Sequence, residues 1–520
     1  MPPLGRGSFR ANRRASRRGA VSERGRIPPG ENVPAHPLLI DGAFEIGSAE
    51  PFVILNPATG EPIDSVPAAS PDQVDTAVAA AVRAQRSWWS APQTVRSAAM
   101  HAVAAEILNR KKDLAETVTL ETGRPYTRNL LYVDMFADLF RQYAELARVH
   151  GGRIAPSNES GQLSLVVRVP YGVIAALIPW NYPLLLLAFK AAPALATGNT
   201  VVIKPSSETT LTTLVLAEVF AATTPPGVVN VVAGSGRTVG EQLVRHPHTD
   251  MVAFTGSTEV GAGIGGICGQ MAKPAHLELG GKDPAIVFDD VDPELAAKAV
   301  VWASFLNAGQ VCTSTERVYV HRRVYDRFVG RVVELASNLR VGDPFDSRTQ
   351  IGPMRSDRGR AKVLEQLAAA QAGGATVLAG GSIPDGSSGF YLLPTVVIDV
   401  DHDMELMREE TFGPVLPIMV FDDDDEAFSL AADTPYGLGA SCYTHTPDRV
   451  RRAYEELAVG TVWVNDPVVD NLAAPFGGMR ASGNVRELGL EGMDAFTSMR
   501  HVHWNMRLED KPWWYGDDGE

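Results

Sequence analysis

The stretch with the clearest potential for chemistry is NAGQVCTST at residues 307–315, which contains one of only three cysteines in a chain of 520 residues. A thiolate attacks carbonyl carbon well when it sits near donors that bind the charge developing on oxygen. The Gly-Gln pair before Cys312 and the Thr-Ser pair after it indicate a turn rather than a sealed apolar core. An ordinary thiol has a pKa of about 8.5, so we expect local activation of Cys312. Free cysteine is also often buried, and a structural role stays open from this position alone.

Two further polar side chains interrupt apolar stretches. Glu278 has a leucine on each side and is followed by Gly280–Gly281. Burial would raise its pKa towards the range of a general base, whereas a strand-end glutamate facing solvent is the alternative. Asn181 lies in PWNYP, where two prolines and two aromatic residues brace its amide. Such an amide suits an oxyanion hole, although asparagine beside proline is also common in turns.

Two glycine-rich loops are weaker signals. FTGSTEVG (254–261) follows a predicted strand and opens a predicted helix, so its backbone N–H groups could bind a phosphate. AGSGRTVG (233–240) has the spacing GxGxxxG, which differs from the dinucleotide fingerprint GxGxxG. Neither loop identifies a cofactor by itself. The sequence has no GxxxxGK[ST] loop, so nothing supports nucleotide hydrolysis of the P-loop type.

The elements that position these residues alternate between helix and strand. Apolar spacing predicts helices over 71–90, 94–123 and 212–223. Runs of β-branched residues predict buried strands over 163–178, 199–205, 227–234 and 250–257. A second alternating block extends from 283 to about 480, and no internal repeat is visible. This alternation predicts an α/β protein with parallel sheets covered on both faces.

Length and composition indicate a globular protein of two or more domains. A chain of 520 residues exceeds one hydrophobic core, and 45% hydrophobic with 21% charged residues is ordinary. No apolar run reaches the ~18 residues of a membrane span. The three cysteines are far apart, which argues against disulfides or a structural metal site and fits a reducing, cytoplasmic location.

The formal charge is uneven along the chain. Residues 1–30 contain eight arginines and one acidic residue, or +7, so the remainder carries −14 − 7 = −21. So acidic a body argues against binding nucleic acid. We expect residues 1–36 to form a disordered Arg-rich extension. Their Arg- and Ser-rich composition leaves an organelle transit peptide or RNA contact as alternatives.

Six stretches in this order resemble the aldehyde dehydrogenase superfamily. They are PWNYP, FTGSTEVG, LELGGK, GQVCTST, EETFGPVLP and PFGGMRASGNVRELG, and the resemblance extends from residue 56 to residue 504. It implies an aldehyde dehydrogenase-like α/β fold with a Rossmann-type cofactor domain, an α/β catalytic domain and a small β oligomerisation arm. The implied boundaries are 37–152 with 171–281 for the cofactor domain, 282–482 for the catalytic domain, 153–170 with 483–506 for the arm, and 507–520 for a C-terminal tail.

The resemblance implies NAD(P)-dependent oxidation of an aldehyde to its acid. Cys312 would attack the carbonyl to give a thiohemiacetal, with Asn181 and the Cys312 N–H binding the oxyanion. Hydride transfer to nicotinamide would leave a thioester, which water activated by Glu278 would hydrolyse. Glu487 matches a family position near this base, where it would help to relay protons. No metal is implied.

The cofactor residues implied by the resemblance approach its ribose rings, pyrophosphate and nicotinamide. They are Lys204, Ser207, Trp180, Gly256, Ser257, Gly261, Glu410 and Phe412. Ser207 departs from the family pattern, because many NAD-preferring members carry glutamate there to bind the ribose 2′-OH. A hydroxyl does not repel a 2′-phosphate, so the sequence permits NADP as well as NAD.

Positions that resemble the family's substrate tunnel are mostly apolar or aromatic. They are Tyr182, Leu186, Phe189, Val311 and Phe476, with Asp470 where other members often place an aromatic residue. The lining favours an apolar aldehyde, since apolar side chains dominate small-molecule sites. Asp470 leaves a cationic aminoaldehyde as the alternative.

Three other functions remain as alternatives. A CoA-acylating dehydrogenase is disfavoured by the presence of Glu278, and a non-catalytic protein on the same scaffold by the presence of Cys312, Asn181 and Glu278 together. A Cys–His hydrolase has no histidine near Cys312 in sequence. Segments 161–170 and 496–506 match the family's arm, whose exposed strand edges predict a homodimer or homotetramer.

Overall fold

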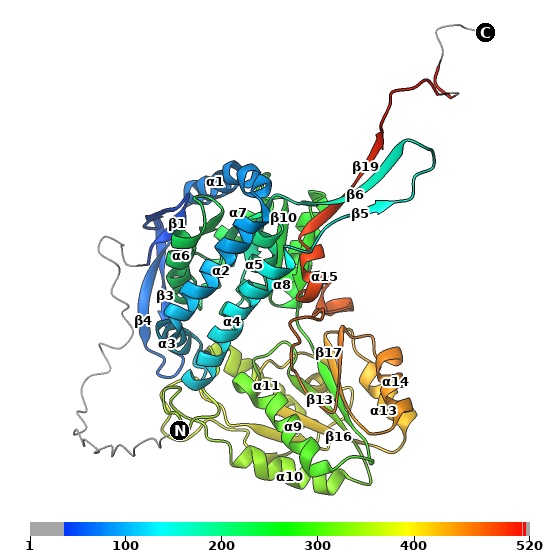
Figure 1. Ribbon diagram of the computed structural model, residues 1–520. Coiled ribbons are helices and arrows are strands. Elements are labelled where there is room, and N and C mark those ends of the chain that lie inside the picture. Colours follow the sequence, from blue (N-terminus) through cyan, green and yellow to red (C-terminus); the bar gives the residue numbers. More distant parts are fainter. Residues whose placement is uncertain (1–35, 512, 516–520) are drawn as a thin grey trace, which may run out of the picture.

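The computed structural model describes residues 36–511 and 513–515 of the chain. The expected Arg-rich extension over 1–36 lies outside these residues except for His36, as does much of the expected tail over 507–520. Figure 1 shows two lobes, each built on one sheet, and a thin β arm that projects from them. The first lobe is the part around the first sheet, and the second lobe is the part around the second.

The first lobe contains a seven-stranded sheet that is parallel through its centre. The five strands β11-β10-β7-β8-β9 are parallel neighbours, and β1 and β2 add antiparallel strands at the β9 side. In this order they are Ala275–Glu278, Met251–Thr255, Val173–Leu177, Thr200–Lys204, Val229–Val231, Leu38–Ile40 and Ala43–Glu45. All residues of β7, β8 and β9 are buried. The predicted parallel sheet is therefore confirmed.

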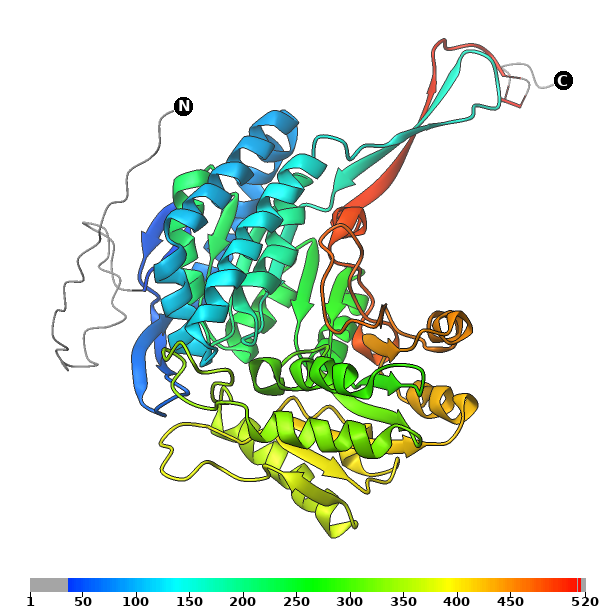
Figure 2. The ribbon, with the colours of Figure 1, turned by 60° about the horizontal axis from the view of Figure 1, so that its bottom comes forward.

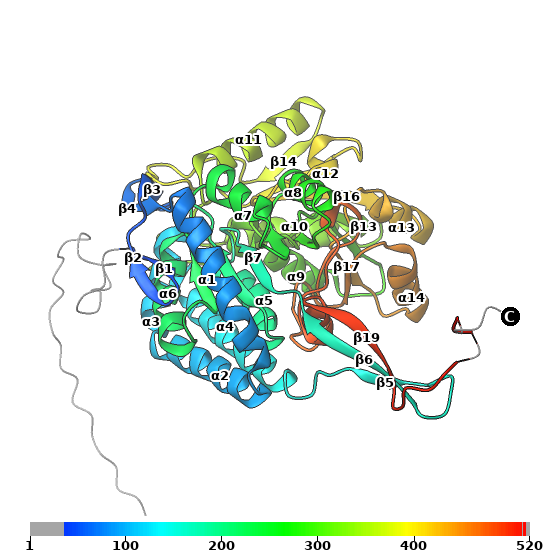
Figure 3. The ribbon, with the colours of Figure 1, turned by 90° about the horizontal axis from the view of Figure 1, so that it is seen from above.

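Eight α-helices surround this sheet. They are α1 (Pro71–Ser90), α2 (Gln93–Asn109), α3 (Lys111–Thr122), α4 (Tyr126–Leu146), α5 (Pro183–Ala196), α6 (Leu211–Thr223), α7 (Glu241–Arg245) and α8 (Thr258–Gln270). α1 has the predicted bounds because Ser70 and Gln73 form a capping box at its start. The predicted helical stretch 94–123 is two helices that meet at Arg110. Figure 3 shows α7 and α8 on the opposite side of this lobe from α2 and α3.

The second lobe is also built on a seven-stranded sheet, but its strands follow a different order. Its seven strands run β14-β15-β16-β13-β12-β17-β18, and only β14 is antiparallel to its neighbour. In this order they are Thr376–Ala379, Thr395–Ile398, Val415–Phe421, Thr315–His321, Asp283–Val287, Gly439–Tyr443 and Thr461–Val464. Its helices are α9 (Pro293–Phe305), α10 (Tyr325–Ser337), α11 (Asp357–Ala372), α12 (Glu405–Arg408), α13 (Asp424–Ala432) and α14 (Pro447–Glu456).

A three-stranded antiparallel sheet forms the arm. It consists of β5 (Arg153–Ala155), β6 (Gln162–Pro170) and β19 (Thr497–Asn505), and β19 follows α15 (Gly489–Asp494). β6 and β19 pair along their full lengths, from Thr497 opposite Pro170 to Asn505 opposite Gln162. Figure 2 shows the arm extending away from both lobes. A separate hairpin joins β3 (Ala49–Leu55) and β4 (Pro62–Ala68).

None of the helices within residues 36–511 and 513–515 is long and apolar enough to cross a membrane.

Candidate active site

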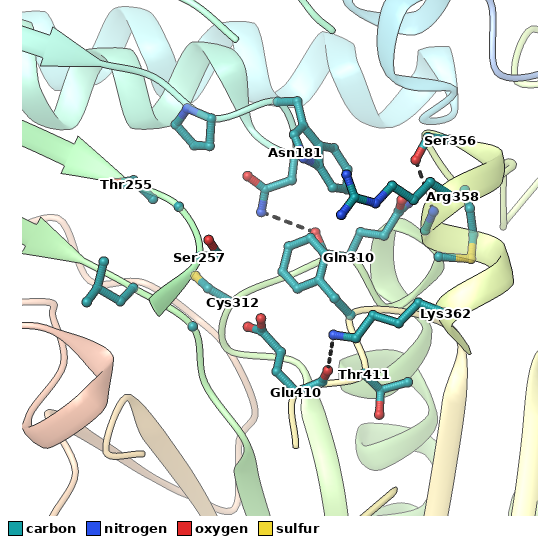
Figure 4. Close-up of a pocket in the computed structure, with 18 of the residues that line it drawn as sticks. Asn181, Thr255, Ser257, Gln310, Cys312, Ser356, Arg358, Lys362, Glu410 and Thr411 are labelled. Atoms are coloured by element: carbon teal, nitrogen blue, oxygen red, sulfur yellow. Dashed lines mark hydrogen bonds between the residues drawn. The ribbon is translucent and has the colours of Figure 1, made fainter. Parts of the chain in front are cut away.

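A cavity of about 370 Å³ lies where the carboxyl ends of β7, β10 and β11 meet loops of the second lobe. Figure 4 shows its side chains converging from both lobes. The predicted residues that line it are Trp180, Asn181, Gly256, Ser257, Glu278, Cys312, Glu410 and Phe412. Five of the six sequence motifs that carry the resemblance thus contribute to one cavity, whereas PFGGMRASGNVRELG does not line it.

Cys312 lies in a strained turn before β13. A short 3₁₀ segment, Leu306–Gly309, follows α9, and within it Asn307 and Ala308 have φ of 53° and 55°. Such left-handed backbone is unfavourable for alanine and persists only where the surroundings enforce it. Gly309, with φ of 73°, has no room for a side chain, because a Cβ there would lie 2.1 Å from the Gly413 carbonyl oxygen. The predicted turn is confirmed.

Asn181 is held beside this turn by hydrogen bonds. Its Nδ2 donates to the Gln310 carbonyl at 3.2 Å, and Asn307 Nδ2 donates to the same carbonyl at 3.2 Å and to the Asn181 carbonyl at 3.4 Å. An amide nitrogen has two hydrogens, so Asn181 keeps one for a ligand. Within the part of the chain that the structure describes, the Cys312 N–H has no acceptor. These two donors are placed to bind an oxyanion on a carbonyl attacked by the thiol.

Glu278 ends β11 and is fully buried as a residue, although it lines the cavity. Neither carboxyl oxygen has a hydrogen-bond partner of ordinary geometry. Burial, and then the negative charge of Glu487, raise its pKa to about 8, while Lys190 and the Cys312 thiol act in the opposite direction. The carboxyl is therefore mostly protonated at neutral pH but titrates in the range useful for a general base.

A buried ion pair acts on Glu278: it joins Glu487, which the resemblance implied near this base, to Lys190, which the sequence reasoning missed. Lys190 Nζ, from the otherwise apolar α5, is 2.8 Å from Glu487 Oε1 and 2.5 Å from Thr255 Oγ1. The side chains of Lys190 and Glu487 are 1% and 4% exposed. The only available sequence signal was a lone lysine inside LLLLAFKAAPALA, which is typical of a buried cation with a distant partner.

The electrostatics of Cys312 differ from the expected activation. Burial, followed by the negative charges of Glu278, Asp283 and Asp470, raises the pKa of the thiol well above its ordinary value. No lysine, arginine or histidine is among the strongest influences on it. Activation of this thiol therefore requires a base or a positive charge close to it.

The cavity is suited to a pyrophosphate because two long helices begin at it. Ser257 caps α8 and accepts from the Val260 N–H at 3.4 Å, and Ser356 caps α11 and accepts from the Gly359 N–H at 3.1 Å. Both helix N-termini present partial positive charge. Arg358 and Lys362 of α11 also line the cavity and add full positive charges.

Gly261 allows α8 to lie close to the strand edge, since a Cβ at Gly261 would lie 2.2 Å from Leu279 Cδ2. Gly256 is similarly confined, because a Cβ there would lie 2.5 Å from the Phe254 ring. Both predicted glycines thus have steric reasons to lack side chains.

The loop that carries Glu410 and Phe412 is fixed by a second buried ion pair. Glu410 Oε1 accepts from the Gly281 N–H at 3.0 Å, and the rings of Phe412 and Trp180 meet edge to face at 5.4 Å. Glu316 accepts from the Phe412 N–H at 2.8 Å and pairs with Lys282 at 2.7 Å. Lys282 and Glu316 are additional positioning residues that sequence reasoning did not single out.

Lys204 and Ser207 do not line this cavity; Lys204 ends the neighbouring strand, β8. Lys204 Nζ donates to the carbonyls of Pro205 at 2.7 Å and Gly234 at 3.1 Å, and burial lowers its pKa to about 8. Ser207 is partly exposed at the same sheet edge.

The predicted apolar and aromatic substrate residues belong to the hydrophobic core against which Cys312 packs. Its predicted members are buried, and they are Tyr182, Leu186, Phe189, Val311 and Phe476. The Phe189 and Phe476 rings are 6.3 Å apart, and the Tyr182 ring is 5.2 Å from that of Tyr132, which the sequence reasoning missed. Asp470 is partly exposed, and burial and then Glu487 raise its pKa to about 6.

Comparison with known proteins gives one consistent result. The family model for the aldehyde dehydrogenase family matches residues 45–502. The chain is 39% identical to the peroxisomal aminoaldehyde dehydrogenase 1 of Malus domestica over 499 residues, covering 93% of this chain and 98% of the relative.

Solved structures agree with this match. The betaine aldehyde dehydrogenase of Staphylococcus aureus in complex with NAD⁺ is similar at a TM-score of 0.90 and 33% identity, covering 94% and 98% of the two chains. An NADP-dependent enzyme of E. coli is similar at 0.88 and 36%, covering 90% and 98%.

Proposed function

The chain belongs to the aldehyde dehydrogenase family, and from this membership we propose which residues perform the oxidation and which aldehydes are oxidised. The protein is an NAD(P)-dependent oxidoreductase that converts an aldehyde to the carboxylic acid. Its fold is that of aldehyde dehydrogenases. We also propose that the cofactor domain, catalytic domain and arm divide at the residues given above.

Cys312 is the proposed nucleophile. Its sulfur bonds to the aldehyde carbon, the carbonyl π pair moves to oxygen, and the thiol proton passes to a base. Asn181 and the Cys312 N–H stabilise the oxyanion, an arrangement supported by the hydrogen bonds around Gln310. The nicotinamide, when bound, accepts the hydride from the former aldehyde carbon. The C–S bond is kept and the carbon becomes a thioester.

Glu278 is the proposed base for hydrolysis of that thioester. It takes a proton from water as the water oxygen bonds to the acyl carbon, and the C–S bond then breaks to return the thiol and release the acid. Its burial and its pKa of about 8 support this role. Glu487, paired with Lys190, is the proposed proton relay, and its effect on the pKa of Glu278 supports this role.

The cofactor is proposed to lie with its pyrophosphate between the N-termini of α8 and α11. Ser257, Arg358 and Lys362 would bind the phosphates, and Glu410 the nicotinamide ribose. Phe412, braced by Trp180, would lie against the nicotinamide, while Lys204 and Ser207 would meet the adenosine ribose. The neutral Ser207 supports use of both NAD and NADP.

We propose that the substrates are cationic aminoaldehydes or trimethylammonium aldehydes. The observation that carries this proposal is Asp470, which is close enough to Cys312 for its negative charge to raise the pKa of the thiol. A carboxylate there attracts an ammonium group. The names of the relatives, aminoaldehyde and betaine aldehyde dehydrogenases, agree with it. Because of Asp470, we propose cationic aldehydes rather than the apolar aldehydes that the lining alone favours.

The test compares 3-aminopropanal and betaine aldehyde with propanal as substrates. We expect kcat/KM to be at least roughly tenfold higher for the cations, corresponding to ~1.4 kcal/mol. A higher value for propanal would reject the substrate class while leaving aldehyde oxidation intact. The Cys312→Ser variant, expected to bind NAD but not to oxidise either aldehyde, separates the class of substrate from the chemistry.

We further propose a cytoplasmic homodimer or homotetramer. The free edges of β18 and of the arm support assembly through strand pairing between copies. Exposed Met499, Val502 and Trp504 on β19 would be covered by such a contact. Gel filtration with light scattering tests it, and a monomer at micromolar concentration would reject it.

A further inference from the structure

A second cavity, of about 330 Å³, borders the segment before Cys312 but is not lined by Cys312 itself. It is bordered by the start of α4, one face of α9, the end of α10 and the 3₁₀ segment that precedes Cys312. Its floor includes apolar side chains of α9, namely Val301, Trp302 and Phe305. None of the proposed catalytic, cofactor or substrate residues lines it.

The side chains that line this cavity include four cations and no carboxylate. Arg124, Arg128, Lys298 and Arg340 line it, whereas no aspartate or glutamate does. Within residues 36–511 and 513–515, none of these four forms an ion pair. This is unusual for a chain with a net charge of −14, in which carboxylates outnumber lysine and arginine.

The N-terminus of α4, which borders this cavity, adds to its positive potential. Pro125 occupies the cap position and provides no side-chain acceptor, and the first turn of α4 contains no acidic residue. Arg128 lies in that first turn, where the helix dipole disfavours a cation unless an anion is close.

Arg124 is the clearest sign of a missing partner. The residue is 3% exposed, and its guanidinium carbon lies 3.9 Å from the Tyr132 ring centroid and 4.0 Å from that of Tyr182. These rings satisfy its faces, but Nη2 is buried without a hydrogen-bond acceptor. A buried charged donor left unsatisfied costs more than the ~1–3 kcal/mol of a neutral one, so an acceptor is expected there.

The cavity is connected to the oxyanion site by one residue. Asn307 lines the cavity, and its Nδ2 donates to the carbonyls of both Asn181 and Gln310. Its backbone is in the left-handed region, so its position depends on these neighbours. A ligand that shifts Asn307 would shift the amide of Asn181.

We propose that this second cavity binds a small, multiply charged anion, of the phosphate or polycarboxylate class, and that the bound anion alters turnover through Asn307. The four cations provide the charge, and one of them, Arg124, is a buried cation that lines the cavity and forms no ion pair among the described residues. The volume admits a small anion, with the α9 side chains contacting any apolar part. The proposal does not depend on which aldehyde is oxidised.

The test measures thermal stability of the enzyme saturated with NAD⁺, so that the pyrophosphate site is filled. Sodium phosphate, pyrophosphate and citrate are each titrated against sodium chloride at constant ionic strength. We expect Tm to rise by several degrees with at least one of them in the wild type. The rise should be lost in Arg128→Gln/Lys298→Gln and kept in the matched control Arg86→Gln/Lys112→Gln, whose cations are exposed, unpaired and distant from the cavity.

Equal Tm shifts in the wild type and in the cavity variant would place the anion elsewhere and overturn the proposal, as would the absence of a shift for all three anions. Turnover with saturating aldehyde is then measured with and without the active anion. We expect kcat to change at least about twofold in the wild type and control but not in the cavity variant. An anion that binds and leaves kcat unchanged would overturn the coupling through Asn307.

Discussion

Lys190 and Glu487 form a 2.8 Å ion pair that is sealed from solvent, and their two charges act on the Glu278 carboxyl in opposite directions. Glu487 raises the pKa of Glu278 and Lys190 lowers it. The pair comes from α5 and from the segment before α15, so two distant parts of the chain set the protonation of one base. This arrangement predicts the direction in which replacing each partner shifts the pKa of Glu278.

Replacing either partner should move the acidic limb of the pH profile of kcat in a defined direction. Glu487→Gln removes a negative charge, so the pKa of Glu278 falls and the limb moves to lower pH. Lys190→Met removes a positive charge, so the limb moves to higher pH, by roughly 1 unit in each case. Each single variant also leaves a buried charge unpaired, at a cost of about 3–5 kcal/mol of stability. Steady-state kinetics between pH 5 and 10 check this, and shifts of both variants in the same direction would contradict it.

Asp470 should determine both the substrate preference and the reactivity of the thiol. In Asp470→Asn, the preference for 3-aminopropanal over propanal should fall by roughly tenfold, because the attracting charge is lost. The same change removes one of the charges that raise the pKa of Cys312, so alkylation by iodoacetamide at pH 7 should be faster. Asp466→Asn, in the same loop, is the matched control. A variant with unchanged substrate preference would show that Asp470 does not face the substrate.

Ser207 should permit the use of NADP. We expect measurable oxidation with NADP in the wild type, and kcat/KM with NADP below roughly a thousandth of that with NAD would contradict this. Ser207→Glu should lower kcat/KM for NADP by at least about tenfold, because a carboxylate repels the 2′-phosphate. Ser207→Ala, which introduces no charge, should retain activity with NADP. Equal losses in both variants would indicate a structural role for the hydroxyl instead.

The sequence was most informative where the chemistry depends on neighbours in the chain. The turn around Cys312, the loop that contains Gly256, and the apolar context of Glu278 are local patterns, and Cys312, Gly256 and Glu278 do line one cavity. Parallel strands such as β7 and β8 were recognisable from their β-branched runs, because both of their faces are buried.

What the sequence could not supply were partners distant along the chain. Lys190 and Glu487 are 297 residues apart, and Lys282 and Glu316 are 34 apart, so no periodicity connects them. The sequence led us to expect local activation of Cys312, but it could not show the four carboxylates that raise the pKa of the thiol, because they come from separate segments that converge only in the fold. The order of the strands within each sheet likewise depends on packing rather than on pattern.

Burial of Glu278 should make the stability of the enzyme depend on pH. Its pKa is about 8 in the folded protein against an ordinary value of 4.5, so the folded state holds a proton that the unfolded state has lost. The contribution is therefore complete below about pH 4.5 and is lost as the pH rises to about 8. Glu121 and Glu410, with pKa raised to about 7 by burial, act in the same direction.

Glu278→Gln should remove the contribution of Glu278 to the pH dependence of stability, because glutamine does not bind this proton. Relative to the wild type, the variant should gain stability as the pH rises from 5 to 8, by up to about 1.4 kcal/mol for each pH unit. Thermal denaturation in a series of buffers measures this, with the exposed Glu365→Gln as the control that should follow the wild type. Parallel curves for Glu278→Gln and wild type would mean that Glu278 is already ionised in the folded protein. Glu278 would then be deprotonated at neutral pH and able to act as a base there.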